Sequence, residues 1–171
     1  LKTAQLLDLA YSLATGRKFL GTFASRKSRV LILTGESGRA AIQRRIATFV
    51  KKSEIIAEDD HFLISESIPK FAKDLDIQLL VTLMQDKRTE VLIIDPIYMA
   101  MGGAEASNIQ SQGELLWTIS DACKQSGATL LVAHHVTKSA ARDVNKLLTL
   151  EDLTQAGFDA YYLPRHIGLY A

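Results

Sequence analysis

The stretch Val91-Leu92-Ile93-Ile94-Asp95 decides the fold, because it joins a continuous apolar run to a carboxylate. Four branched apolar residues in succession are typical of a parallel β-strand that is covered on both faces. The carboxyl ends of such strands open onto the ligand crevice, where Asp95 is then expected to lie. The acid has two interpretations: it holds the water shell of a magnesium ion, or, because Pro96 follows it, it opens a turn.

Along the rest of the chain, strand patterns alternate with helical patterns, which predicts an α/β fold built by right-handed crossovers. We predict further strands over 29–34, 61–65, 129–133 and 161–170, and helices over 4–14, 39–52, 70–87, 109–125 and 151–156. A glycine-containing loop is predicted around Gly102 and Gly103. The sequence has no internal repeat and no sign of a second domain, so residues 1–171 are expected to form one domain.

Composition limits the function classes without choosing among them. A hydrophobic content of 47% over 171 residues is enough for one sizeable core, and the net charge of +1 gives no overall positive field that points to nucleic acid. The single cysteine, Cys123, excludes an intrachain disulfide and is expected to serve packing rather than as a reactive thiol. No signal peptide and no membrane-spanning apolar run are found, so a cytoplasmic location without membrane partners is expected.

The first residues, Leu1-Lys2-Thr3, run directly into the predicted helix over 4–14. Lys-Thr at the start of a helix is the end of a phosphate-binding loop, in which the lysine contacts the outer phosphates and the threonine hydroxyl binds magnesium. So short a pair matches any lysine that is followed by threonine. The glycines of the motif do not precede it, and we therefore expect the chain to begin inside the loop, without the strand that leads into it.

Polar residues also end two other predicted strands. Glu36 follows the strand over 29–34, where a carboxylate can orient or deprotonate a water that attacks a terminal phosphate. Its alternative is an acid that is favourable at the amino end of the next helix. His134 and His135 follow the strand over 129–133, at a position to sense a terminal phosphate or bind a metal. Adjacent residues of a strand point to opposite faces, so a metal shared by the two histidines is not expected. No cysteine or carboxylate stands at ligand spacing, so a zinc site is not expected either.

The ordered segments of the chain resemble a known family, the RecA-like ATPases, and within them the RepA-type branch that is related to hexameric replicative helicases. The segments that carry the resemblance are LATGRKFLG, VLILTGESG, VLIIDP, LLVAHHVTK and LTLEDLTQAGFDAYYLPRH. The resemblance implies a P-loop NTPase fold, a three-layer sandwich around a mainly parallel RecA-like sheet. It also implies ATP and Mg²⁺ as cofactors and a homo-oligomeric ring or filament.

By this resemblance, Lys2 and Thr3 end the phosphate-binding loop, Glu36 is the catalytic carboxylate and Asp95 is the magnesium-side acid. His134 and His135 are similar to the paired histidines that couple the terminal phosphate to the nucleic-acid loops.

Arg165 corresponds to an arginine that such ring ATPases insert into the neighbouring subunit's site, where a guanidinium neutralises charge on the transferred phosphoryl group. Its alternative is a surface charge on an edge strand, since Pro164 precedes it. Leu1 departs from the family pattern, because the loop usually has glycine before the lysine. A side chain there implies either a variant loop or weak nucleotide binding.

A basic stretch offers a candidate contact with nucleic acid. Lys138, Arg142 and Lys146 lie among small and polar residues, and a basic loop of this kind can track a phosphate backbone in the channel of a ring. A solvated surface loop explains the stretch equally well. No motif for reading bases is present, so binding to single-stranded DNA without base specificity is expected.

Two functions follow. The first is an ATP-hydrolysing domain of a DNA helicase or of a replication or recombination motor, which the carboxylate of Glu36 favours. The alternative is a nucleotide-dependent assembly or regulatory module with slow hydrolysis and no DNA binding, which Leu1 favours. A dinucleotide-binding dehydrogenase is a poor third, because no G-x-G-x-x-G follows a first strand.

Overall fold

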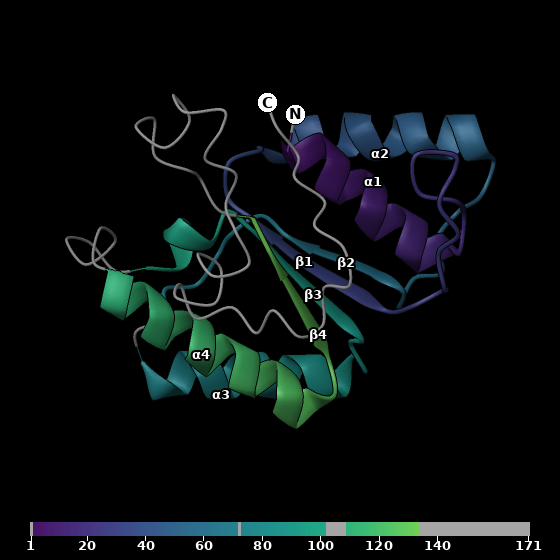
Figure 1. Ribbon diagram of the computed structural model, residues 1–171. Helices are drawn as coiled ribbons and strands as arrows, with labels where there is room; N and C mark the ends of the chain where they lie inside the picture. The colour runs from purple at the N-terminus through teal and green to yellow at the C-terminus, as the bar shows by residue number, and fades with distance from the viewer. Residues whose placement is uncertain (1, 72, 102–108, 134–171) are drawn as a thin grey trace, which may run out of the picture.

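The computed structural model describes residues 2–71, 73–101 and 109–133 (Figure 1). The helices are α1 (Lys2–Thr15), α2 (Arg39–Ser53), α3 (Asp74–Asp86) and α4 (Ile109–Ser126), and a short 3₁₀ helix, η1, spans Ile97–Ala100. The strands are β1 (Val30–Thr34), β2 (Phe62–Ser65), β3 (Val91–Asp95) and β4 (Thr129–Val132). The strands and helices predicted from the sequence up to residue 133 are all present. The predicted helix over 151–156 and strand over 161–170 lie outside the described residues.

The sheet of the described residues is entirely parallel and has the strand order β2-β1-β3-β4. β1 lies between β2 and β3, and its five residues pair in register with β3, from Val30 opposite Val91 to Thr34 opposite Asp95. Because the strands are parallel, their final residues meet at one border of the sheet, which we call the carboxyl edge. Thr34 and Asp95 are therefore neighbours at this edge.

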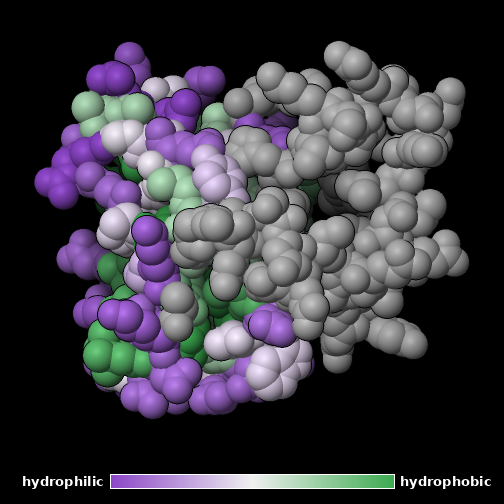
Figure 2. Space-filling view, turned by 90° about the vertical axis from the view of Figure 1, so that its left-hand side faces the viewer, coloured by the Kyte–Doolittle hydropathy of each residue, from purple (hydrophilic) through white to green (hydrophobic). Residues whose placement is uncertain are grey.

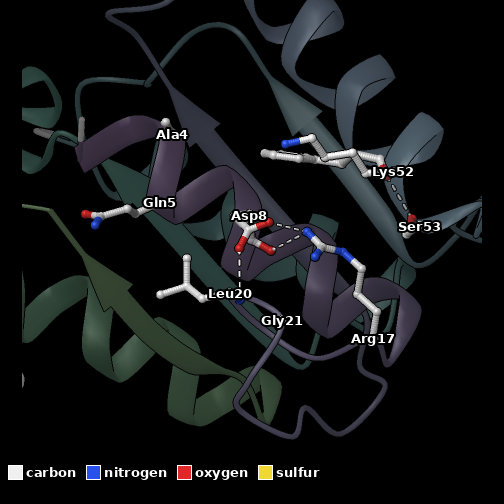
Figure 3. A pocket seen from close by; sticks show the side chains of 9 residues that line it. Ala4, Gln5, Asp8, Arg17, Leu20, Gly21, Lys52 and Ser53 are labelled. Atoms are coloured by element: carbon white, nitrogen blue, oxygen red, sulfur yellow. Dashed lines mark hydrogen bonds and ion pairs between the residues drawn. The ribbon is translucent and has the colours of Figure 1, made fainter.

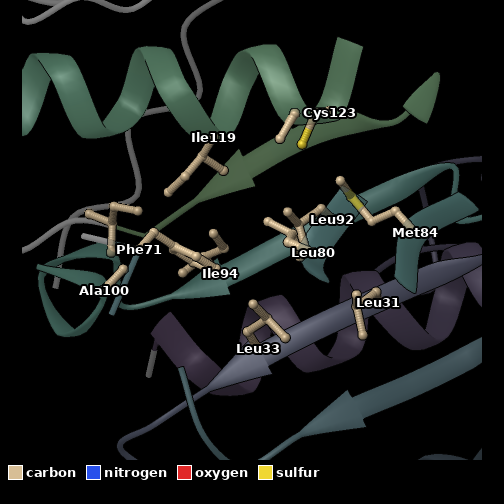
Figure 4. Packing of buried hydrophobic residues seen from close by; sticks show 12 residues of the cluster. Leu31, Leu33, Phe71, Leu80, Met84, Leu92, Ile94, Ala100, Ile119 and Cys123 are labelled. Carbon is tan, nitrogen blue, oxygen red and sulfur yellow. The ribbon is translucent and has the colours of Figure 1, made fainter. Parts of the chain in front are cut away.

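Helices cover both faces of the sheet, with α1 and α2 on one side and α3 and α4 on the other (Figure 1). Each face has its own hydrophobic cluster. Val30, Ile32 and Ile93 pack with α1 and α2, whereas Leu31, Leu33, Leu92 and Ile94 pack with α3 and α4, as Figure 4 shows for the second cluster. Consecutive strand residues thus reach opposite clusters, which explains the unbroken apolar runs. The predicted α/β three-layer fold is confirmed.

α1 lies antiparallel to the strands. The backbone N–H of Ser28, two residues before β1, donates a hydrogen bond to the carbonyl of Leu13, near the end of α1 (2.9 Å). The carboxyl end of α1 is thus fixed where β1 begins. A helix of 14 residues is about 21 Å long and a strand of five residues about 17 Å. The amino end of α1, with Lys2 and Thr3, is consequently directed toward the carboxyl edge.

α3 begins later than the sequence predicts. The predicted start was residue 70, but the helix begins at Asp74, after Lys73 in an extended conformation (φ −123°, ψ 139°). Phe71 explains the difference, because its side chain is only 5% exposed and its N–H donates to the carbonyl of Ala100 (3.2 Å). Packing of this aromatic ring against the core and the extended backbone of Lys73 together place the start of α3 at Asp74.

The surface over α3 keeps apolar side chains. Leu75, Leu79 and Leu83 recur every fourth residue and are 62%, 58% and 40% exposed. Figure 2 shows hydrophobic residues gathered toward the bottom of this face, at the level of α3 and α4, while hydrophilic residues dominate the upper described surface.

Cys123 lies in the core between α4 and the sheet and is 2% exposed, so the prediction of a packing role is confirmed (Figure 4). Burial raises the pKa of its thiol to about 12. Because only the thiolate reacts, alkylation of the folded protein by iodoacetamide at pH 8 is expected to be at least about 10³-fold slower than that of free cysteine. The rate in denaturant, measured by mass spectrometry, is expected to return to the free value. Rapid labelling of the native protein would contradict this placement.

Candidate functional site

The candidate site lies at the carboxyl edge, where β1 and β3 end side by side. Thr34 and Asp95 are register partners and are 0% and 2% exposed. The N–H of Gly35 donates to the main-chain carbonyl of Asp95 (3.1 Å), so the two strands stay paired up to the point where the chain leaves the sheet. Two polar side chains are thus buried at the position where a parallel sheet opens to its ligand.

Both side chains carry a polar atom that has no partner among the described residues. The Thr34 hydroxyl and the Asp95 Oδ2 atom are buried and make no hydrogen bond with any other described residue. Leaving such an atom unpaired costs about 1–3 kcal/mol, and more for a charged group. A carboxylate oxygen in this position is satisfied by a cation or by the waters that surround one. The buried pair is therefore suited to a ligand that brings its own charge or donors.

Magnesium fits this donor set. Among the described residues, no group of three or more His, Cys, Asp or Glu side chains is arranged to hold a metal ion. Mg²⁺ does not require such a cage, because it keeps several waters and binds through one or two carboxylates together with the phosphates of a substrate. Asp95 would supply the carboxylate oxygen. The position predicted for this acid from the sequence, at the carboxyl end of a buried strand, is confirmed, and Pro96 then leads into η1.

A second carboxylate stands nearby. Glu36 is the second residue after β1 and is exposed, and its Oε1 accepts a hydrogen bond of 2.9 Å from the hydroxyl of Tyr98 in η1. The hydrogen bond to Glu36, partial burial and the negative charges of Glu36 and Asp95 raise the pKa of Tyr98. The phenol therefore keeps its proton and acts as the donor. The negative charges of Glu36 and Asp95 both raise the pKa of Tyr98, so the two predicted acids lie near the same tyrosine.

The first turn of α1 is directed toward the same edge. Lys2 and Thr3 are both partly buried in this turn. The first N–H groups of a helix have no partner within the helix, and the helix dipole favours an anion there. The orientation of α1 agrees with a phosphate contact from this turn.

The chain also returns to the edge at the end of β4. The N–H of Ala133 donates to the Ile94 carbonyl (2.9 Å), and the N–H of Ile97 donates to the Ala133 carbonyl (2.9 Å). The residue that precedes His134 therefore lies beside the end of β3. The predicted site residues Leu1, His134, His135, Lys138, Arg142, Lys146 and Arg165 lie outside the described residues, as do Gly102 and Gly103.

Two polar residues of the site were not among those predicted from the sequence. Thr34 ends its strand as Asp95 does, and this shared position was a signal that was available in the sequence. Tyr98 had no such signal, because nothing in the sequence relates a tyrosine to a glutamate that lies 62 residues away.

An open pocket of about 380 Å³ lies elsewhere, between α1, the end of α2 and the turn that follows α1 (Figure 3). Arg17 and Asp8 form an ion pair there, and the guanidinium lies over the rings of Tyr11 and Phe49, 5.3 and 5.4 Å from their centroids. None of the predicted site residues lines it. The polar groups of Arg17 and Asp8 are paired with each other in this pocket. The carboxyl edge, where the predicted acids lie, therefore remains the candidate site.

Within the described part of the chain, no helix combines the length and the apolar character needed to cross a membrane.

Comparison with known proteins agrees with this geometry. A family model described as AAA domain matches residues 1–141, which includes the first turn of α1, Glu36 and Asp95. Arg142, Lys146 and Arg165 lie beyond the match. No curated protein matches the chain. The match spans most of the sequence and accompanies a parallel α/β sheet with acids at its carboxyl edge, and it shows that the chain belongs to the AAA domain family of P-loop ATPases, which bind nucleotides, usually with Mg²⁺.

Proposed function

We propose that this domain binds ATP and Mg²⁺ at the carboxyl edge and hydrolyses the ATP as part of a RepA-type DNA motor. The observation that carries the proposal is the buried Oδ2 atom of Asp95, which has no partner among the described residues, beside the equally unpaired hydroxyl of Thr34. Such a pair is costly in a site without a ligand and is satisfied by a hydrated cation that a phosphate chain brings with it.

Each predicted residue of the edge has a role in this proposal. The Lys2 ammonium group contacts the outer phosphates, and the N–H groups of the first turn of α1 add further donors. The Thr3 hydroxyl and the Asp95 carboxylate hold Mg²⁺. When bound, the ion neutralises charge on the phosphate oxygens.

Glu36 is the proposed general base. Its carboxylate is exposed beyond the end of β1, at the same edge as Asp95, and it is tied to η1 by Tyr98. A base in this position orients the attacking water and accepts its proton, while the phosphates are held from the side of α1.

The remaining roles fall on residues outside the described part of the chain. His134 and His135 are proposed to couple the terminal phosphate to the DNA-binding stretch. Arg165 is proposed to enter the site of a neighbouring subunit in a homo-oligomeric ring or filament, where its guanidinium neutralises charge on the transferred phosphoryl group.

Single-stranded DNA is expected to raise the rate of ATP turnover of the full-length protein several-fold. Lys138, Arg142 and Lys146 are proposed to contact the phosphate backbone, and each contact adds about 0.7 to the slope of log affinity against log salt concentration. Replacing all three by alanine is therefore expected to lower the slope by about 2, as measured by fluorescence anisotropy of a labelled oligonucleotide over a salt series.

The matched control replaces Lys51, Lys87 and Lys124 by alanine, because these exposed lysines lie at the carboxyl ends of α2, α3 and α4, away from the carboxyl edge, and give the same change in net charge. The control is expected to keep the slope of the unaltered protein. Turnover that does not respond to DNA, together with an unchanged slope in the first variant, would instead favour a nucleotide-dependent assembly or regulatory module that does not bind DNA.

A further inference from the structure

The turn that carries Glu36 is held by the segment that follows the neighbouring strand. Glu36 leaves the sheet after β1, and η1 leaves it after β3, so the two segments run side by side at the carboxyl edge. The hydroxyl of Tyr98 donates to Oε1 of Glu36 across this gap (2.9 Å). The contact is thus between two loops that only the pairing of β1 with β3 brings together.

The donor, Tyr98, lies in a short helix that is anchored in the core. Ile97 and Ala100, on either side of Tyr98 in η1, are 4% and 1% exposed and belong to the core that packs against α3 and α4. The N–H of Phe71 donates to the Ala100 carbonyl (3.2 Å), and the N–H of Ile97 donates to the Ala133 carbonyl (2.9 Å). Tyr98 itself is 39% exposed and points outward from this anchored turn to Glu36.

The acceptor stands on a turn between β1 and α2. Glycines precede and follow it, at positions 35 and 38, and Glu36 is exposed. Gly35 allows η1 to approach closely, because a Cβ atom at this position would lie 2.6 Å from both Sδ and Cε of Met99. A glutamate on such a turn has many rotamers in water, and a hydrogen bond to one oxygen limits them.

From these contacts we infer that Tyr98 is a positioning residue for hydrolysis: its hydroxyl holds the Glu36 carboxylate in the orientation from which it accepts a proton. The inference rests on the proposed function, since it takes Glu36 as the general base. In the step itself, water transfers a proton to Glu36 and its oxygen forms a bond to the terminal phosphorus of ATP. The bond from that phosphorus to the bridging oxygen breaks, and ADP leaves with the electron pair.

A carboxylate can accept more than one hydrogen bond. The hydrogen bond from Tyr98 occupies one of the roughly four lone-pair sites that the two oxygens of a carboxylate offer, and a lone pair of the same group accepts the proton of water in the proposed step. Tyr98 does not compete for that proton, because it keeps its own next to the charges of Glu36 and Asp95. The tyrosine therefore orients the base without replacing it.

Replacing Tyr98 by phenylalanine tests the role, because the ring stays in place and only the hydroxyl is lost. One hydrogen bond to a charged group corresponds to about a tenfold change. We expect Tyr98→Phe to lower kcat of the full-length protein about tenfold, while KM for ATP and the melting temperature stay as they are. Steady-state kinetics and thermal unfolding measure these values.

A second tyrosine provides the control. Tyr11 also donates its hydroxyl to a protein oxygen, the carbonyl of Ile55, but it lies in the interior of α1 and is 1% exposed. Tyr11→Phe is expected to lower the melting temperature and to leave kcat unchanged at temperatures where the variant is folded. Equal losses of kcat in the two variants would mean that Tyr98 acts only through stability, and would overturn the positioning role.

A double-mutant cycle with Glu36→Gln separates this inference from the proposed function. Tyr98→Phe is expected to have no further effect in the Glu36→Gln background, where single-turnover conditions extend the measurement to slow rates. An equal tenfold loss in both backgrounds would show that Tyr98 does not act through Glu36. Full kcat in Tyr98→Phe together with a large loss in Glu36→Gln would overturn the inference and leave the proposed function standing. Full turnover in Glu36→Gln would overturn the role of Glu36 in the proposed function, and with it the inference.

Discussion

Glu36→Gln is expected to lower ATP turnover by about 10²- to 10⁴-fold, the range that a positioned general base contributes. Glutamine keeps the size of the side chain and can still accept a hydrogen bond from Tyr98, but it cannot take a proton from water. Binding of nucleotide, which the proposal assigns to α1 and Asp95, is expected to remain. Turnover is measured by phosphate release and affinity by calorimetry with ATP and Mg²⁺.

The control for this variant is Glu114→Gln, which makes the same chemical change at an exposed position of α4. It is expected to keep full turnover. If Glu36→Gln hydrolyses ATP as fast as the unaltered protein, Glu36 is not the base, and the favourable position of an acid at the amino end of α2 remains as its explanation.

Asp95→Asn is expected to have the second large effect, a loss of Mg²⁺-dependent turnover of about 10²-fold or more, since a metal ion contributes several kcal/mol to the stabilisation of charge in the transition state. The stability of the ligand-free protein, in contrast to the turnover, is not expected to fall. A buried carboxylate oxygen without a partner is costly, so the neutral amide is expected to melt at a temperature at least as high as the aspartate does.

Ligand-dependent stability provides the sharper measurement. ATP with Mg²⁺ at a hundred times its dissociation constant stabilises a folded protein by about 2.7 kcal/mol, so the melting temperature of the unaltered protein is expected to rise. The rise is expected to be much smaller in Asp95→Asn and unchanged in the control Asp59→Asn, which lies at an exposed position before β2. An equal rise in both variants would remove Asp95 from the metal side of the site.

Much of the fold could be predicted from the sequence, because the two central strands, β1 and β3, are short and apolar up to their last residue. In β1 and β3 each residue meets one hydrophobic cluster and its neighbour meets the other, so no polar residue interrupts the pattern. The predicted start of α3 was wrong because of a contact that is distant in sequence. Phe71 belongs to the core through a contact with the end of η1, and the local pattern does not reveal that the backbone must stay extended there.

The candidate site was readable only in part. Asp95 and Glu36 were predicted because each is an acid at or just after the end of an apolar strand, and the structure places both at one edge. Thr34 has the same position but was not among the predicted site residues, and a hydroxyl at the end of a strand does not by itself indicate a ligand. The assignments of His134, His135 and Arg165 remain predictions, since these residues lie outside the described part of the chain.

By itself, the sequence determined the elements and the edge at which chemistry is to be expected, because hydrophobic period and strand length are local properties of the chain. Only the tertiary structure decided which polar atoms meet there. The order of strands places Thr34 opposite Asp95 and brings η1 beside the turn of Glu36, and so joins Tyr98 to a residue 62 positions away. The burial of Asp95 Oδ2, which has no partner among the described residues, is likewise a property of the packed molecule, since only packing against neighbouring elements removes water from that atom.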